Sequence, residues 1–494
     1  MRQTLRRSCA ACAKSKCSCD LSKPRCSRCV KRQLQCVYAN EPSAAPPAAS
    51  GQADNESIKK LVESNTIPSY RFGGLDPFDS YPQTRLPREH AQRLIHSCMY
   101  QSTLSLKAQL TNLVLHKIAF QYYPLDLNPV SNPFLISWWP LALGDPALFH
   151  VSLQTACLDE ELLAQRGFRI SEILMADSVT LLRRKIEDTT LAVQDGTLNS
   201  VITLATIEFG KGNINVSEMH VDGVKKLVHM RGGINAVRQT NPLTARMVSW
   251  VSMLIMGYPQ FETQDDLGIG DGIPPVPEWR LESTTIDDNP PELSSVFTDH
   301  AVRNVFIRLR ILFQRAQRIP YTPSRLHDLT CFVVHRLLSS PDTGKSQSTP
   351  VTECIRHAII LYMFIIQGPT YYPHGVILNT LVTRYIEHLN QLELTPRVHD
   401  SLDIWLLAVG MVASFDTTHH VVLVEKARDI AANLPLDNWH DAFIYIKSVL
   451  WLETEEGEGI FRLHWDPILG AANAEPPDFT DCVSSNIFLS SEEL

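Results

Sequence analysis

Six cysteines near the start of the chain are spaced in a way that suits metal binding. They form two copies of one unit, in which a two-residue gap is followed by a six-residue gap: Cys9-x2-Cys12-x6-Cys19 and Cys26-x2-Cys29-x6-Cys36. A two-residue gap lets both thiolates of a pair turn back onto one tetrahedral zinc ion. Residues 1–30 contain no apolar stretch typical of a secretory signal, so clustered thiols indicate a metal site in a reducing compartment rather than disulfides.

Six thiolates cannot complete two separate four-sulfur sites, which would need eight. Two of them must therefore bridge two zinc ions, and the repeat makes Cys9 and Cys26 the natural bridges. Cys17 lies outside the repeat and is expected to be a free thiol. The segment has few apolar residues, so its folding free energy must come from metal, about 10–16 kcal/mol for structural zinc. The sequence thus predicts two Zn²⁺ held by Cys9, Cys12, Cys19, Cys26, Cys29 and Cys36.

Charge is strongly polarised along the chain. Residues 1–40 carry ten Lys and Arg side chains and one acid, whereas the rest carries 35 basic and 52 acidic side chains, a net charge of −17. A basic head, residues 1–40, followed by an acidic body, the rest of the chain, indicates that only the head binds a polyanion such as double-stranded DNA. The side chains expected to contact phosphate are Lys14, Lys23, Arg28, Lys31 and Arg32.

The cysteine spacing, together with Lys16, the Lys23-Pro24 turn and Cys36-Val37-Tyr38, resembles the fungal binuclear zinc cluster transcription factors. The run Cys12-Ala13-Lys14-Ser15-Lys16 is similar to the variant found in regulators of secondary-metabolite pathways, such as the aflatoxin pathway regulator. This resemblance implies that Lys16 reads the guanines of a CGG- or TCG-like triplet in the major groove. It also implies a nuclear regulator of RNA polymerase II genes that acts with the transcription machinery and can form a homodimer. Activation is favoured over repression.

Other interpretations of the head stay open. A metallothionein-like store would lack the basic side chains and the long body, and a four-cysteine zinc ribbon would leave two cysteines over. Many members of the resembled family have basic residues where this chain has Ala13, Ser15 and Ser18. The main alternative is therefore a regulatory interaction protein that acts through partner factors without binding DNA.

The rest of the chain is expected to be an all-α regulatory domain. Residues 41–69 are predicted to be a flexible linker because they are rich in Pro, Ala, Ser and Gly. A helical pattern at 54–67 covers only about two heptads, which is too few for a coiled-coil zipper. Apolar residues then recur at intervals of three and four over 70–470, without sustained alternation. The predicted helices include 170–182, 244–256, 302–313, 325–338, 353–366, 376–392, 404–415 and 420–434.

One further predicted helix has sequence signals for both its start and its end. Ser217 is predicted to be its N-cap, and Gly232-Gly233 is predicted to end it in a left-handed conformation. Residues 219–223 and 230–233 are similar to the helical regulatory domain that often follows the zinc cluster. Residues 471–494 contain acidic side chains but no Lys or Arg. They are predicted to be an acidic disordered tail, which is either an activation segment or a solvated tail without such a function.

The body has no motif that predicts catalysis, so the protein is not expected to be an enzyme. The glycines of residues 268–272 lack the strand and helix of a dinucleotide-binding loop and read as an ordinary loop. Cys98, Cys157, Cys331 and Cys354 lie in apolar helical patterns and are predicted core residues. The longest apolar runs are shorter than the roughly 20 residues of a membrane-spanning helix, so no membrane partner is expected.

Overall fold

The computed structural model describes residues 11–12, 15, 26–32, 81–99, 131–281 except 166, 297–339, 349–368, 375–392 and 400–469 except 416, 435, 437, 455 and 456. The chain divides into two compact units, Met1–Gly74 and Leu75–Leu494. Over these residues the regular structure is helical, apart from an isolated bridge between Thr263 and Ile273. The all-α class is confirmed. The predicted linker at 41–69 and acidic tail at 471–494 lie outside the described residues.

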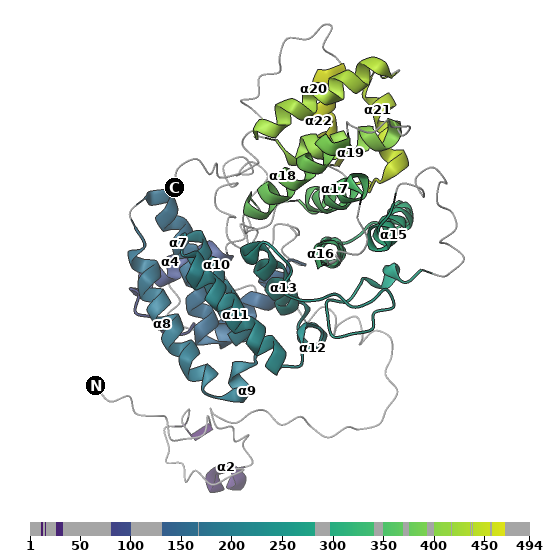
Figure 1. The fold of residues 1–494 in the computed structure, drawn as a ribbon. Helices are drawn as coiled ribbons and strands as arrows, with labels where there is room; N and C mark the ends of the chain where they lie inside the picture. Colours follow the sequence, from purple (N-terminus) through teal and green to yellow (C-terminus); the bar gives the residue numbers. More distant parts are fainter. Residues whose placement is uncertain are drawn as a thin grey trace, which may run out of the picture. The chain divides into compact units, whose positions relative to one another are not determined.

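The first half of the larger unit is built around α10 (Asp195–Gly210). Every residue from Gly196 to Ala205 is buried, because the helix is apolar or small on all sides and must be enclosed by others. Figure 1 shows α10 among its neighbours in blue and teal, and the contacts confirm their proximity. These neighbours are α7 (Pro146–Ala164), α8 (Arg169–Ile186), α11 (Ile214–Met230) and α13 (Pro242–Met256).

Shorter elements complete this half. Asp145 begins α7 as an N-cap by accepting hydrogen bonds from the amides of Ala147 and Leu148, at 3.1 and 3.4 Å. A side-chain cap of this kind satisfies amides that the first turn leaves without partners. The further elements are α4 (Arg88–Met99), the π-helix η3 (Phe134–Trp138), α6 (Trp139–Gly144), α9 (Thr189–Ala192), α12 (Ile234–Thr240) and the 3-10 turn η4 (Pro277–Trp279).

The second half is organised around α17 (Pro350–Gln367) and α19 (Asp400–Ala413). Tyr362 of α17 lies among the rings of Phe313, Trp405, Trp451 and Phe461, with centroid distances of 6.0 to 6.4 Å. Its hydroxyl accepts a hydrogen bond from the amide of Leu452 at 2.9 Å. The surrounding helices are α15 (His300–Ala316), α16 (Pro323–Ser339), α18 (Gly375–Leu392), α20 (Thr418–Asn433), α21 (Trp439–Val449) and α22 (Gly457–Leu469).

All eight predicted helices are present, as α8, α13 and α15 to α20. In α15 the apolar stripe faces the core as expected, with Val302, Phe306 and Leu309 buried. Helices α17 and α19 differ from the expected amphipathic pattern because they are buried on nearly all sides over residues 354–364 and 404–411. Each helix is surrounded by several others, so a single apolar stripe would leave polar side chains in the core.

The prediction that Ser217 is the N-cap of its helix was wrong. Helix α11 begins three residues earlier, at Ile214. Ser217 lies inside the helix, fully buried, and its hydroxyl donates a 2.6 Å hydrogen bond to the carbonyl of Ala205 in α10. The serine thus joins two packed helices. At the other end the prediction is confirmed, since Gly232 and Gly233 both have positive φ, at 97° and 94°.

Two smaller predictions are also confirmed, one on buried cysteines and one on the loop at residues 268–272. Cys157, Cys331 and Cys354 are buried in the helical core, whereas the side chain of Cys98 lies outside those described. Residues 268–272 form a loop, and the amide of Ile269 within it donates a 2.7 Å hydrogen bond to the carboxylate of Asp265. Among the helices the structure describes, none combines the length and the apolar character needed to cross a membrane.

A buried ionic cluster joins α12, α13 and α16. Asp328, whose side chain is 4% exposed, accepts hydrogen bonds from Arg238 at 3.1 and 3.3 Å and from Arg246 at 2.8 and 3.0 Å. Burial by itself raises the pKa of Asp328, but the hydrogen bonds and charge of Arg246, with the charge of Arg238, outweigh it and hold the pKa below its ordinary value. The carboxylate is therefore ionised and tightly held.

Two buried histidines are expected to make the helical body less stable in mild acid. Burial lowers the pKa of His335 to about 4, and burial together with the neighbouring His420 lowers that of His464 to about 4. In the unfolded chain these rings have a pKa of about 6.5. Between about pH 6.5 and pH 4 the unfolded chain therefore takes up protons that the folded chain does not, and the free energy of unfolding falls as the pH falls.

Urea unfolding followed by circular dichroism at pH 7, 6 and 5 checks this expectation. Each unit of pKa difference corresponds to about 1.4 kcal/mol. Asp266 and Asp328, whose pKa values are lowered, titrate mainly below this window. The variant His464→Gln should show a shallower dependence of the unfolding free energy on pH, and an unchanged dependence would contradict the role given to His464.

Candidate metal centre

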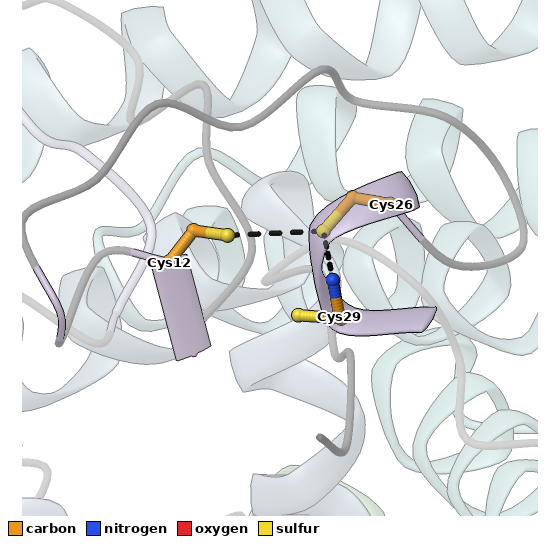
Figure 2. A group of neighbouring side chains, drawn as sticks. All are labelled: Cys12, Cys26 and Cys29. Atoms are coloured by element: carbon orange, nitrogen blue, oxygen red, sulfur yellow. Dashed lines mark hydrogen bonds between the residues drawn. The ribbon is translucent and has the colours of Figure 1, made fainter. Parts of the chain in front are cut away.

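Three of the six predicted zinc ligands lie together in the smaller unit. Cys12 belongs to a helical turn, Cys26 is the N-cap of α2 (Ser27–Lys31), and Cys29 lies inside that helix. Their sulfur atoms are all within 4.8 Å of one another. Figure 2 shows the side chains of Cys12 and Cys26 pointing toward each other, with Cys29 beside them. The chain thus brings together residues that are 14 and 3 positions apart.

The local fold of α2 explains why the two-residue gap works. Cys26 has an extended backbone, with φ −66° and ψ 147°, and its carbonyl accepts the first helical hydrogen bond, from Val30 at 3.0 Å. Its sulfur accepts a 3.4 Å hydrogen bond from the amide of Cys29. A side chain at the N-cap folds back over the first turn. The Cys26 sulfur and the Cys29 side chain are therefore presented on the same side of the turn.

The cysteines are the buried centre of this part of the chain. Cys12 is 2% exposed, while Cys26 and Cys29 are fully buried. Among the described residues, the one partly buried hydrophobic side chain that packs against them is Ala11. Such a cluster has too little apolar surface to stabilise a fold. The Cys12 and Cys26 sulfur atoms lie 3.7 Å apart, close to the edge of about 3.8 Å of a tetrahedron with Zn–S bonds of about 2.3 Å. The described residues therefore fit zinc.

Cys26, which the sequence predicts to bridge the two ions, contacts both units of the cysteine repeat. Its sulfur lies next to Cys12 of the first unit of the cysteine repeat and next to the amide of Cys29 in the second unit. A ligand shared by two ions has to reach both units. Cys9, Cys19 and Cys36, and the predicted free thiol Cys17, lie outside the described residues, so the complete ligand set stays a prediction.

Positive charge follows the cysteines on α2. Arg28 is half-buried, and Lys31 and Arg32 are exposed at the C-terminal end of the helix. Six thiolates and two Zn²⁺ would sum to about −2, which neighbouring cations offset. Exposed cations on a short metal-bound helix are also suited to contact phosphate. The other predicted DNA contacts, Lys14, Lys16 and Lys23, lie outside the described residues.

A second group of possible metal ligands was not singled out from the sequence. Glu353 and His357 of α17 and His388 of α18 place one ligand atom each within 4.8 Å of the others. The only signal in the sequence is the spacing of four between Glu353 and His357, which puts both on one face of a helix. His388 is 31 positions further along, and only the packing of α18 on α17 brings it to them.

Comparison with known proteins identifies two domains. Residues 7–45 match the fungal Zn(2)-Cys(6) binuclear cluster domain, and residues 115–256 match the fungal specific transcription factor domain. The first of these domains holds two zinc ions and contains all six cysteines of the repeat. The second ends at Met256, the last residue of α13, and so includes the helices packed around α10.

The chain is similar over short stretches to curated fungal regulators. It is 31% identical over 134 residues to the peroxisome proliferation transcriptional regulator of Saccharomyces cerevisiae, covering 26% of this chain and 13% of that protein. It is 35% identical over 72 residues to the aflatoxin biosynthesis regulatory protein of Aspergillus flavus, covering 13% and 16%. It is 46% identical over 52 residues to the oleate-activated transcription factor 1 of S. cerevisiae, covering 10% and 5%.

The matched stretches thus span less than a fifth of the length of each of these relatives. No solved structure matches the chain significantly.

Proposed function

We propose that this chain, which carries both the binuclear zinc cluster domain and the helical domain of fungal transcription regulators, binds specific DNA sequences and regulates RNA polymerase II genes in the nucleus. The observation that carries the proposal is the buried group of Cys12, Cys26 and Cys29, two of which belong to a short helix, α2, whose C-terminal end presents Lys31 and Arg32. A metal centre without basic side chains would suit storage, and basic side chains without a metal centre would be an ordinary solvated surface.

In this proposal the six cysteines of the repeat hold two Zn²⁺, with Cys9 and Cys26 as the bridging ligands. The ions supply the free energy that folds the head and fix the direction of its short helices. Lys16 donates hydrogen bonds to guanine N7 and O6 of a CGG- or TCG-like triplet. Phosphate contacts come from Lys14, Lys23, Arg28, Lys31 and Arg32, and they set the register without carrying sequence information.

We assign residues 1–40 to the DNA-binding head, 41–69 to a linker, 70–470 to the helical regulatory domain and 471–494 to an acidic tail that contacts the transcription machinery. Activation of a secondary-metabolite gene cluster is supported by the similarity to the aflatoxin biosynthesis regulatory protein. Homodimerisation through the body, rather than a zipper, would set the spacing of two half-sites. The regulator has no catalytic role.

Replacing Lys16 by Ala in the full-length protein is expected to weaken binding to its preferred site by about 1–3 kcal/mol, with much less effect on unrelated DNA. The reason is that a lost base contact removes sequence discrimination. The matched control is Lys31→Ala, which removes a phosphate contact. It should weaken binding to all sequences equally and reduce by about one the slope of log affinity against log salt. Fluorescence anisotropy with specific and scrambled duplexes measures both effects.

The same titration separates the regulator from the alternative, an interaction protein that acts only through partner factors. Such a protein would bind specific and scrambled duplexes with the same affinity, and Lys16→Ala would change neither. That result would overturn the proposed DNA-binding function. It would not change the conclusion that the cysteines bind zinc, because zinc content is measured independently of DNA binding.

A further inference from the structure

We propose that Glu353, His357 and His388 form a second metal site, which takes a divalent transition metal ion, Zn²⁺ in the first instance, and joins α18 to α17. The three side chains come from two packed helices of the body and place their ligand atoms within 4.8 Å of one another. The site lies in the larger unit, whereas the zinc cluster lies in the smaller one. It therefore adds an ion to the two of the cluster.

His357 is held in the orientation and tautomer that a metal ligand needs. Its side chain is buried, and its Nδ1 donates a 2.8 Å hydrogen bond to the carbonyl of Glu353 one turn earlier. Because the carbonyl only accepts, the proton is on Nδ1, and Nε2 keeps a lone pair in the neutral ring. Histidine ligands of metal ions commonly have their second nitrogen bonded to a backbone carbonyl in this way.

His388 supplies a nitrogen that lacks a partner. Its ring lies 5.4 Å from that of His357, centroid to centroid, at an angle of 34°. Its Nδ1 is buried and has no hydrogen-bond partner among the residues that the structure describes. A buried polar atom without a partner is destabilising. Coordination of a metal ion by this nitrogen would satisfy it and would account for two imidazoles packed together at one helix interface.

The charges around Glu353 favour a cation. Its carboxylate lies 3.1 Å from Nε of Arg356, and the same guanidinium is also bonded to Asp299. Two carboxylates around one guanidinium leave a net charge of −1. A carboxylate has about four lone-pair positions, so Glu353 can bond to Arg356 and still offer an oxygen to an ion.

The ligand set indicates the kind of ion. Two imidazoles and one carboxylate suit zinc and its first-row neighbours rather than Mg²⁺ or Ca²⁺, and such a set leaves the fourth position of a tetrahedron to water. Ligand atoms around a tetrahedral ion are about 3.4 Å apart when its bonds are about 2.1 Å long. Closing the group from within 4.8 Å takes rotation of the half-buried side chains of Glu353 and His388.

The experiment is to count bound zinc in full-length protein equilibrated at a fixed micromolar concentration of free Zn²⁺. We expect three ions per chain in the parent protein and two in His388→Gln. The matched control is His440→Gln, because His440 is an exposed histidine on α21 outside the group; it should keep three. The difference of one ion between the parent protein and His388→Gln tests the second site, whatever the number of ions that the cysteines hold.

A second measurement keeps the test decisive if His388→Gln alters the fold. A metal that binds the folded state raises the melting temperature, so Zn²⁺ should raise that of the helical body in the parent and in His440→Gln. It should have no such effect in Glu353→Gln, which changes one atom of the carboxylate. A parent protein that holds no more zinc than His388→Gln, or an ion count that is the same in the parent, His388→Gln and Glu353→Gln, would overturn the site.

Discussion

Replacing Cys26 by Ser is expected to unfold the zinc cluster and to reduce binding of the preferred DNA site to the level of unrelated DNA, a loss of about a thousandfold or more. Cys26 is fully buried, caps α2 and lies 3.7 Å from the sulfur of Cys12. As a proposed bridge it serves both zinc ions, so its loss weakens both sites. Few apolar side chains are there to replace the free energy that the metal supplies.

The measurement combines elemental analysis of zinc with anisotropy titrations of the purified full-length protein. Cys17→Ser is the matched control, since it removes a neighbouring thiol that the repeat does not use. It should retain two zinc ions in the head and full affinity. A Cys26→Ser protein that keeps both ions and binds its site normally would show that the cluster is built differently from the proposal.

Replacing Asp328 by Ala is expected to lower the free energy of unfolding of the helical body by about 3–5 kcal/mol. The substitution leaves Arg238 and Arg246 beside each other, with side chains only 22% and 16% exposed and without the carboxylate that both contact. Buried charge without its partner is far more costly than the pair. The total free energy of unfolding of a domain is about 5–15 kcal/mol, so this loss would remove a large part of it.

Urea unfolding at pH 7 measures this loss. The matched control is Asp466→Ala, which breaks the exposed pair between Arg462 and Asp466 on α22, whose side chains are about half exposed. Exposed pairs contribute about 1 kcal/mol or less. If both variants lost the same small amount, the ionic cluster of α12, α13 and α16 would not be the structural link that its burial indicates.

The fold could be predicted where helices are amphipathic or clearly capped. The stripe of Val302, Phe306 and Leu309 identified α15 because one face is buried and the other is polar. Helix α10 offered no such stripe, since it is enclosed on all sides and its apolar and small residues show no period. Ser217 misled because a serine near a helix start has the same sequence signature whether it caps the helix or bonds to its neighbour.

The parts of each metal site that are formed by residues close together in the sequence could be predicted. The cysteine spacing placed Cys26 and Cys29 on one turn without knowledge of the rest of the chain, and the structure places Cys12 with them. Glu353 and His357 also share a helical face, yet two residues do not specify a metal site. His388 completes the group only through the packing of α18 on α17, which the order of residues does not reveal.

Selection of binding sites from random duplex DNA by the zinc-loaded full-length protein tests the central proposal most directly. We predict enrichment of a CGG- or TCG-like triplet, and loss of that enrichment when a chelator removes zinc. A protein that holds its zinc but enriches no sequence would contradict the account, and it would leave a regulator that reaches its genes through partner proteins.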